Sequence, residues 1–307
     1  DALALPSALV LDHPTTRLPA ALSNEREAPV PLGRHPAEAP NSAELVLLVL
    51  HGEAADGALM NRILELSGWL DELKAHGITV EFIDAPHVVS PVPQLFANLA
   101  AAGEYGRPSY FGWGLVSEEQ KHRTIAAQKQ ELTAEAQGPE LTAEDETSRA
   151  AAVSESVRHV ERWIEQHSPI SGICGISDGA LIAAAVAARS PSIEMFINFC
   201  SMPWERLPTG MDLEVPQPIA TRSLHLLGRA DPILSTAQLW SVPSRCENMT
   251  TLWHNGGHSV PLLDGAIAAA LRRFLGAGAG ADHLSRARQQ LTAAPSLDTV
   301  STATRIL

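Results

Sequence analysis

The feature that most constrains the fold of this chain is the stretch SPISGICGISDGALIAAAVAARS, from Ser168 to Ser190. Its first half, residues 170–176, is short, apolar and partly β-branched, which predicts a strand buried on both faces. Its second half, residues 180–189, is rich in alanine and aliphatic residues, which predicts a helix. A buried strand that runs directly into a helix is typical of a parallel α/β sheet.

The junction between the two halves carries a G-x-S-x-G pattern, from Gly175 to Gly179 with Ser177 at its centre. At a strand-to-helix turn this pattern holds the serine in a strained backbone conformation at the top of a sheet. Small residues are needed two positions before and after the serine because strand and helix pass close together. The turn also aims the N-terminus of the helix at negative charge that develops on a substrate. The pattern therefore predicts an exposed nucleophilic hydroxyl at Ser177.

The rest of the chain repeats the alternation of strand and helix. Apolar runs predict further buried strands, and helical spacing of apolar residues predicts the helices between them. The expected strands are residues 43–50, 78–83, 170–176, 193–200, 222–227 and 250–254, and the expected helices are residues 57–73, 150–166, 180–189, 234–240 and 261–275. This order predicts a doubly wound, mostly parallel sheet, with ligands bound beyond the carboxyl ends of the strands.

Three parts of the chain do not fit this alternation. Residues 1–42 are rich in Ala and Pro and read as a poorly ordered extension, and residues 276–307 as a Gly/Ala linker and tail with one short helix at 283–293. Residues 91–147 read as an insertion that is either a lid over the site or a solvated surface loop. We expect residues 43–275 to form the main domain. The Pro-rich lead, the linker and a first residue other than Met also suggest a segment of a larger protein.

Charge and cysteine content narrow the class of protein. With 22 Lys+Arg against 35 Asp+Glu the formal charge is −13, and 5% of residues are aromatic, so nucleic acid is not an expected partner. Of the three cysteines, Cys174, Cys200 and Cys246, the first two lie in apolar strand-like runs and are expected to be buried thiols, which fits the cytoplasm. No apolar run reaches the roughly 20 residues of a membrane span. The sequence does not decide whether a targeting peptide has been removed.

A nucleophilic serine needs a base and an orienting acid, and both follow Ser177 at strand ends. Asp231 comes after the strand at 222–227, and His258 after the strand at 250–254. Each has a simpler alternative, since Asp231 could form a turn or cap a helix and His258 could cap the last helix. His254 is a competing base. The spacing from His254 to His258 also suggests a metal site, but the Asn-Gly-Gly between them makes a poor helix, so we expect no metal and no cofactor.

Acyl transfer also needs N–H donors for the oxyanion. Asp178, directly after the serine, is one expected donor, and the loop after the first strand should supply the second, with Glu53 preferred and Ala54 possible. We expect His51 and Gly52 in the same loop to contact the substrate, although His51 could instead support the loop. A wall of the pocket is expected from the aromatic cluster Tyr110, Phe111 and Trp113.

The segments LVLLVLHGEAADG, VEFIDAP, GICGISDGA, LLGRADPILS and HNGGHSVP, in this order, resemble the FSH family of small serine hydrolases. The resemblance covers about residues 43–275 and implies the α/β-hydrolase fold. It implies cleavage of carboxylic esters or thioesters, with Ser177 as nucleophile, Asp231 as acid and His258 as base. It also implies that the region of Phe111 lines the acyl site.

Two departures from the family pattern are visible. Asp178 stands where Gln is common, and the loop Glu53-Ala54-Ala55-Asp56 is unusually acidic. Carboxylates beside an oxyanion site oppose the developing charge unless they point away or are neutralised. The leading hypothesis is a serine hydrolase acting on a small acyl ester or thioester. The alternative is a binding or scaffold domain of the same fold with weak catalysis. The sequence does not indicate an oligomeric state.

Overall fold

The computed structural model describes residues 45–89, 110–115, 142–167 and 169–276. The chain divides into two compact units, one that ends at Asp264 and one that begins at Gly265. In the second unit the described residues form helix α8 (Gly265–Gly276). The described elements of the first unit are β1 (Leu45–Leu50), α1 (Gly57–Leu66), α2 (Trp69–Ala75), β2 (Ile78–Ile83), β3 (His87–Val88), β4 (Phe111–Gly112), α5 (Ala143–His167), β5 (Gly172–Ile176), α6 (Asp178–Arg189), β6 (Met195–Phe199), η2 (Trp204–Arg206), β7 (Arg222–Gly228), α7 (Thr236–Leu239), η3 (Pro243–Arg245) and β8 (Met249–His254).

Among the described residues, six strands form one sheet in the order β2-β1-β5-β6-β7-β8, and every neighbouring pair is parallel. The expected doubly wound, mostly parallel sheet is therefore confirmed. The chain leaves β1 toward one edge to form β2 and returns to the other side of β1 to form β5. In such sheets the loops at this change of direction form a crevice for ligands. The loops after β1 and β5 are those that carry Glu53 and Ser177.

Burial on both faces explains why the inner strands β1, β5 and β6 are mostly apolar, whereas the edge strands β2 and β8 are partly exposed. In β1, residues Leu47 to Leu50 are all fully buried. Leu48 and Leu50 belong to the core cluster formed with α5 and α6. On the opposite face, the Trp69 ring of α2 meets the Phe199 ring of β6 edge to face, with centroids 4.8 Å apart.

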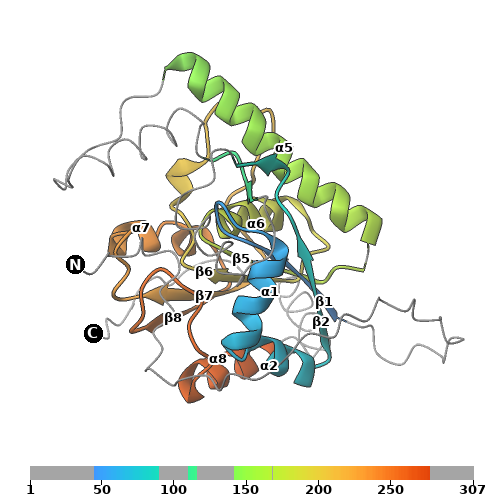
Figure 1. Cartoon of the computed structure of the whole chain (residues 1–307), viewed down its shortest axis with the longest axis vertical. Coiled ribbons are helices and arrows are strands. Elements are labelled where there is room, and N and C mark those ends of the chain that lie inside the picture. Colours follow the sequence, from blue (N-terminus) through green and yellow to red (C-terminus); the bar gives the residue numbers. More distant parts are fainter. Residues whose placement is uncertain (1–44, 90–109, 116–141, 168, 277–307) are drawn as a thin grey trace, which may run out of the picture. The chain divides into compact units, whose positions relative to one another are not determined.

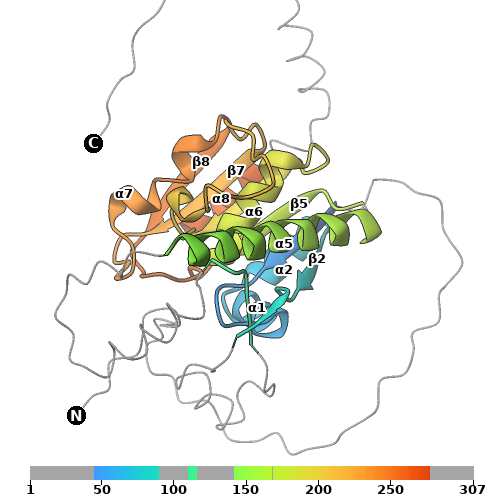
Figure 2. The same cartoon turned by 90° about the horizontal axis from the view of Figure 1, so that it is seen from above.

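The helices of the first unit cover both faces of the sheet. Helices α1 and α2 pack against β1 and β2, and α6 packs against β5 and β6 (Figure 1). The long helix α5 lies outside α6, as the view from above shows (Figure 2). It buries Val153, Val157 and Val160, the apolar stripe that the sequence predicts for this segment.

Two helices differ from the expected bounds. The predicted helix over residues 57–73 is two helices, because Gly68 has φ +82°, in the left-handed region, and ends the helical path. Helix α5 begins at Ala143, about two turns before the predicted start at residue 150. Its first turn contains three acidic residues, which favour the positive end of a helix, and Thr142 and Asp145 hydrogen-bond to each other there.

The expected helix over residues 261–275 begins at Gly265 instead. The predicted extension at residues 1–42, most of the insertion at 91–147 and the short helix at 283–293 lie outside the described residues. The division into extension, main domain and tail thus stays a prediction. Within the described ranges, we find no helix that is both long and apolar enough to cross a membrane.

Candidate active site

Ser177 lies where β5 passes into α6, at the C-terminal edge of the sheet. Its backbone has φ +55° and ψ −122°, a conformation that residues other than glycine rarely adopt. Its carbonyl oxygen accepts hydrogen bonds from the N–H groups of Leu181 and Met202, both at 3.2 Å, and its N–H donates to the Phe199 carbonyl at 3.1 Å. The predicted strained turn is therefore present, and the neighbouring backbone holds it from several sides.

The two glycines of the pattern are needed for different close approaches. A Cβ on Gly175 would lie 2.6 Å from the backbone of Gly179 and Ala180, in the first turn of α6. A Cβ on Gly179 would lie 2.1 Å from the carbonyl oxygen of His51, just after β1. The helix N-terminus thus packs against the end of the neighbouring strand as well as against its own.

Asp231 and His258 meet although they are far apart in the sequence. His258 Nδ1 lies 2.7 Å from Asp231 Oδ2, and both side chains are about 1% exposed. Burial by itself would raise the pKa of Asp231. The hydrogen bond and charge of His258, with the N–H groups of Leu234 and Ile233, outweigh burial and hold that pKa below its usual value. Asp231 is therefore an ionised acceptor, and His258 Nδ1 carries the shared hydrogen.

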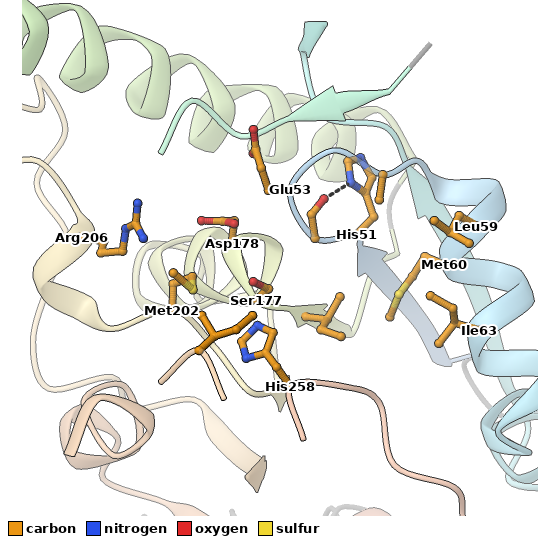
Figure 3. A pocket seen from close by; sticks show the side chains of 14 residues that line it. His51, Glu53, Leu59, Met60, Ile63, Ser177, Asp178, Met202, Arg206 and His258 are labelled. Atoms are coloured by element: carbon orange, nitrogen blue, oxygen red, sulfur yellow. Dashed lines mark hydrogen bonds between the residues drawn. The ribbon is translucent and has the colours of Figure 1, made fainter. Parts of the chain in front are cut away.

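The opposite ring nitrogen, His258 Nε2, is buried and has no hydrogen-bond partner among the described residues. Nε2 is the ring nitrogen on the side away from Asp231. Figure 3 shows the ring beside Ser177 in the same pocket. A general base must come within hydrogen-bond reach of the hydroxyl, and Nε2 makes no such bond among the described residues, so the role of His258 as the base of Ser177 stays a prediction.

A close contact between two loops brings the acid and the histidine together. A Cβ on Gly228, at the end of β7, would lie 2.2 Å from the carbonyl oxygen of Gly257. Hydrogen bonds from Arg229 N to His254 O at 2.9 Å and from Ala230 N to Gly256 O at 3.1 Å join the loops. Neither Gly256 nor Gly257 has a positive φ. The backbone bends at Asn255 and Gly256 without a positive φ, and the closest approach between the two loops is at Gly228.

The competing base, His254, points elsewhere. Its Nδ1 accepts a hydrogen bond from Gly256 N at 3.2 Å, and its Nε2 lies 4.0 Å from Cys200 Sγ. Burial lowers the pKa of His254, which keeps the ring neutral. This geometry favours His258 over His254 as the base.

Cys200 is also the one thiol close to the Asp231–His258 pair. One ligand atom from each of these three residues lies within 4.8 Å of the others. However, burial raises the pKa of the Cys200 thiol to about 12, and the Asp231 and His258 atoms are already joined by their hydrogen bond. A protonated thiol and an occupied histidine nitrogen are poor metal ligands. The three side chains suit proton transfer better than metal binding.

The loop after β1 is stabilised by hydrogen bonds of two buried rings, those of His51 and Trp113. His51 is fully buried, its Nε2 accepts from Ala85 N at 2.9 Å, and its Nδ1 lies 2.6 Å from the Gly52 carbonyl oxygen. Burial lowers the pKa of His51, so the ring is neutral. The Trp113 indole donates to the His51 carbonyl oxygen at 2.7 Å. Both ring nitrogens of His51 therefore face backbone groups, which supports the loop-supporting role that the sequence left open.

The two acidic side chains of this loop, Asp56 and Glu53, make different contacts. Asp56 caps α1, because its Oδ1 accepts from Leu59 N at 2.7 Å. It is not among the described residues that line the pocket of Ser177. Glu53 Oε2 accepts from Trp113 N at 3.3 Å, and Glu53 and Asp178 both line the pocket. A Cβ on Gly52 would lie 3.6 Å from Ser177 Cβ, which places the loop directly beside the serine. The roles of Glu53 and Asp178 as oxyanion donors stay predictions.

The pocket around Ser177 has a volume of about 230 Å³. Its lining includes Ser177, His258, His51 and Gly52. Three charged residues, Glu53, Asp178 and Arg206, also line it. The remaining lining is apolar and consists of Ala55, Leu59, Met60, Ile63, Ile176, Met202 and Ile233. Figure 3 shows Arg206 on one side of the serine and Leu59, Met60 and Ile63 on the other.

The aromatic cluster is not part of this lining. Trp113 is fully buried in the core, so the pocket-wall interpretation is wrong for it. Tyr110 is 3% exposed, and its carbonyl oxygen accepts from Val89 N at 2.8 Å. Phe111 pairs with Val88 and bridges to Ala55. Neither Tyr110 nor Phe111 is among the described lining residues, and a contact of either with substrate stays a prediction.

Sequence reasoning missed lining residues of two kinds. The apolar side chains Leu59, Met60 and Ile63 lie on α1, and Met202, Arg206 and Ile233 lie in the connections after strands, where the rule for parallel sheets places ligand contacts. Met202 and Arg206 follow β6, and Ile233 follows β7.

Comparison with known proteins gives a consistent result. The profile of the family described as "Serine hydrolase (FSH1)" matches residues 41–269. An esterase OVCA2 from Xenopus tropicalis is 31% identical over 106 residues, which cover 33% of this chain and 46% of that protein. The esterase OVCA2 of Danio rerio is 24% identical over 236 residues, which cover 72% of this chain and 92% of that protein.

The chain spans about half the length of the frog, cattle and mouse esterases that it matches. Among solved structures, the Zea mays acyl-protein thioesterase 2 is similar, with 16% identity, a TM-score of 0.45, and coverage of 78% of this chain and 97% of that chain.

Proposed function

Because the chain belongs to the FSH1 family of serine hydrolases, we propose that it cleaves carboxylic esters or thioesters through Ser177, His258 and Asp231. The observation that carries this proposal is the buried His258–Asp231 pair at 2.7 Å, in which His258 lines the same pocket as Ser177. The strained backbone at Ser177 adds support, since folded proteins keep such strain mostly where function needs it.

In the first half of the reaction, Ser177 Oγ attacks the acyl carbon and its proton passes to His258 Nε2. Asp231 holds the ring through Nδ1 and stabilises the imidazolium. We assign donation to the oxyanion to the backbone N–H of Asp178, at the N-terminus of α6, and to that of Glu53. When the tetrahedral intermediate collapses, His258 Nε2 returns the proton to the leaving alcohol or thiol.

In the second half, His258 Nε2 takes a proton from water, and the water oxygen attacks the acyl-serine. Collapse of this second intermediate breaks the bond to Ser177 Oγ and returns the proton to it. The products are the carboxylic acid and free enzyme. The apolar side chains of the pocket, including Met60, Ile63 and Met202, favour an acyl or alcohol part with apolar surface.

Labelling with a fluorophosphonate probe tests the nucleophile. The probe should attach to Ser177 of the folded protein, and Ser177→Ala should remove the labelling and lower kcat for p-nitrophenyl butyrate by about 10⁴-fold or more. Ser201, which is buried and hydrogen-bonded to Met202 O, gives a matched control, since Ser201→Ala should keep the label. Labelling that survives Ser177→Ala would exclude this nucleophile.

The second candidate is a binding or scaffold domain with weak turnover. It rests on Glu53 and Asp178, which line the pocket and whose negative charge opposes an oxyanion. Hydrolysis of p-nitrophenyl butyrate no faster than that of the Ser177→Ala protein would favour it.

A further inference from the structure

Arg206 lies in η2, just beyond the C-terminal end of β6, and reaches the pocket of Ser177. Its backbone is firmly held. The Arg206 carbonyl oxygen accepts from Arg149 Nη1 at 2.9 Å, and Arg149 is paired with Glu146 at 2.9 Å. The Arg206 N–H donates to Pro203 O at 2.9 Å. The position of this residue at the pocket is thus set by the fold.

The Arg206 guanidinium has no ion pair or hydrogen bond among the described residues, in contrast to its neighbours. Arg149 pairs with Glu146, and Arg245 pairs with Glu205 at 3.0 Å. Arg206 is also the one arginine or lysine among the described residues that line the pocket. A half-buried guanidinium with five donors that no protein acceptor uses is suited to bind an anion.

The pocket has opposite chemistry at its two sides. Figure 3 shows Arg206 beside Asp178 on one side and the α1 residues Leu59, Met60 and Ile63 on the other, with Ser177 and His258 between them. A substrate whose carbonyl lies at Ser177 therefore has an apolar surface on one side and a cation on the other. The protein as a whole carries a formal charge of −13. A local cation is thus needed for any anionic group to bind here.

We propose that Arg206 binds a carboxylate of the substrate, on the side of the scissile carbonyl away from α1. The preferred substrates are then esters or thioesters that carry an apolar chain and a carboxylate. This inference rests on the proposed hydrolase function and names the class of substrate for that site. A guanidinium and a carboxylate form two parallel hydrogen bonds, which also fix the orientation of the substrate.

Another role for Arg206 would be to offset the charge of Asp178 without touching substrate. The two roles differ in what they predict. Neutralisation of Asp178 would help every ester equally, because the developing oxyanion is common to all. Binding of a substrate carboxylate would help the ester that carries it more than a matched neutral ester.

Two pairs of esters test the inference and distinguish the possible positions of the carboxylate. In the first pair the acyl part carries it, as in p-nitrophenyl hydrogen suberate against its methyl ester. In the second pair the leaving group carries it, as in 3-carboxyphenyl butyrate against the carboxamide. The measured quantity is the ratio of kcat/KM for the acid to that for its neutral partner. Wild-type protein should prefer the acid by about 10-fold or more in one pair.

Substitution of Arg206 should remove this preference. Arg206→Gln should lower the ratio by about 10- to 100-fold, and Arg206→Lys, which keeps the charge but not the forked geometry, should restore part of it. Arg62→Gln is the control, because Arg62 is exposed on α1 and pairs with Glu65 at 2.6 Å. It should leave the ratio unchanged.

The failure of the inference is distinguishable from that of the proposed function. Wild-type protein that is labelled at Ser177 and hydrolyses neutral esters, but prefers neither acid, overturns the inference alone. A ratio that Arg206→Gln leaves unchanged also overturns it, and assigns Arg206 to the neutralisation of Asp178. Absence of both labelling and hydrolysis overturns the proposed function, and the inference with it.

Discussion

At the scale of single residues, Asp231 has two separate tasks. Oδ2 accepts from His258 Nδ1 at 2.7 Å, while Oδ1 accepts from the N–H groups of Ile233 at 2.8 Å and Leu234 at 2.9 Å. The turn-forming role that the sequence offered as an alternative is therefore real and coexists with the pairing to histidine. One oxygen shapes the loop and the other orients the ring.

The substitution Asp231→Asn separates these two tasks. The amide oxygen can still accept from Ile233 and Leu234, whereas the NH₂ group facing His258 would force the hydrogen of the ring from Nδ1 to Nε2. We expect kcat for p-nitrophenyl butyrate to fall by about 10⁴-fold with little change in melting temperature. Asp212→Asn is the control, because Asp212 is exposed and pairs with Arg158. A rate close to that of the wild type would contradict the assignment of Asp231 as the acid.

At the scale of elements, the sequence predicts the strands well. The inner strands β1, β5 and β6 are mostly buried apolar runs, and all six strands of the sheet, including the partly exposed β2 and β8, lie within two residues of the expected bounds. The break between α1 and α2 was missed because apolar spacing continues across Gly68, from Leu66 to Trp69. The start of α5 was missed because its first turns are polar and expose Glu144 and Thr147.

The candidate site was predictable to the extent that it depends on strand ends. The chain order Ser177, Asp231, His258 and the positions of the strands were enough to predict that Asp231 and His258 would meet. Sequence reasoning could not find Arg206, because η2 is three residues long and has no periodic pattern. Nor could it separate Trp113 from the pocket, since an aromatic residue in a loop suits a pocket wall as well as a core.

The contact between the loops after β7 and β8 leads to a prediction at this scale. Gly228→Ala would place a Cβ 2.2 Å from Gly257 O, so the loops that bear Asp231 and His258 must separate. We expect the free energy of unfolding to fall by about 1–3 kcal/mol, and kcat to fall with it.

Urea denaturation of Gly228→Ala beside Gly257→Ala checks this prediction. The Cβ added at Gly257 has Ala230 O as its nearest neighbour at 3.4 Å, an ordinary contact. The second variant should therefore lose less stability than the first. Equal losses would mean that the close approach at Gly228 is not what limits substitution.

At the scale of the whole molecule, buried histidines couple stability to pH. Burial lowers the pKa of His225 to about 3, and His225 bonds to Asn198 Nδ2 at 2.8 Å and to Ser223 Oγ at 2.9 Å. Burial also lowers the pKa values of His51 and His254. Each ring stays neutral in the folded chain at a pH where the unfolded chain binds a proton.

The sign of the effect follows from proton uptake. Between the unfolded pKa of about 6.5 and the folded pKa of about 3, the unfolded chain holds one more proton at His225, so stability falls as pH falls. Each such histidine lowers the free energy of unfolding by about 1.4 kcal/mol per pH unit. Asp231, whose pKa is also lowered, adds a loss of the same sign at lower pH.

Urea denaturation at several pH values between 6 and 4 measures this slope. His225→Asn should reduce the slope of the free energy of unfolding against pH by the contribution of about one proton. In the folded protein the ring signals of His225 in NMR spectra should not move over this range. A titration of those signals near pH 6 would contradict the prediction.

The three cysteines have a further consequence. Cys174, Cys200 and Cys246 are all buried and unbridged, and Cys200 lies beneath the loop that bears His258, with its Sγ 3.8 Å from Gly257 O. An alkylating reagent can reach these thiols only when the surrounding structure opens. The rate at which Cys200 is alkylated therefore reports how often the loop that bears His258 opens locally.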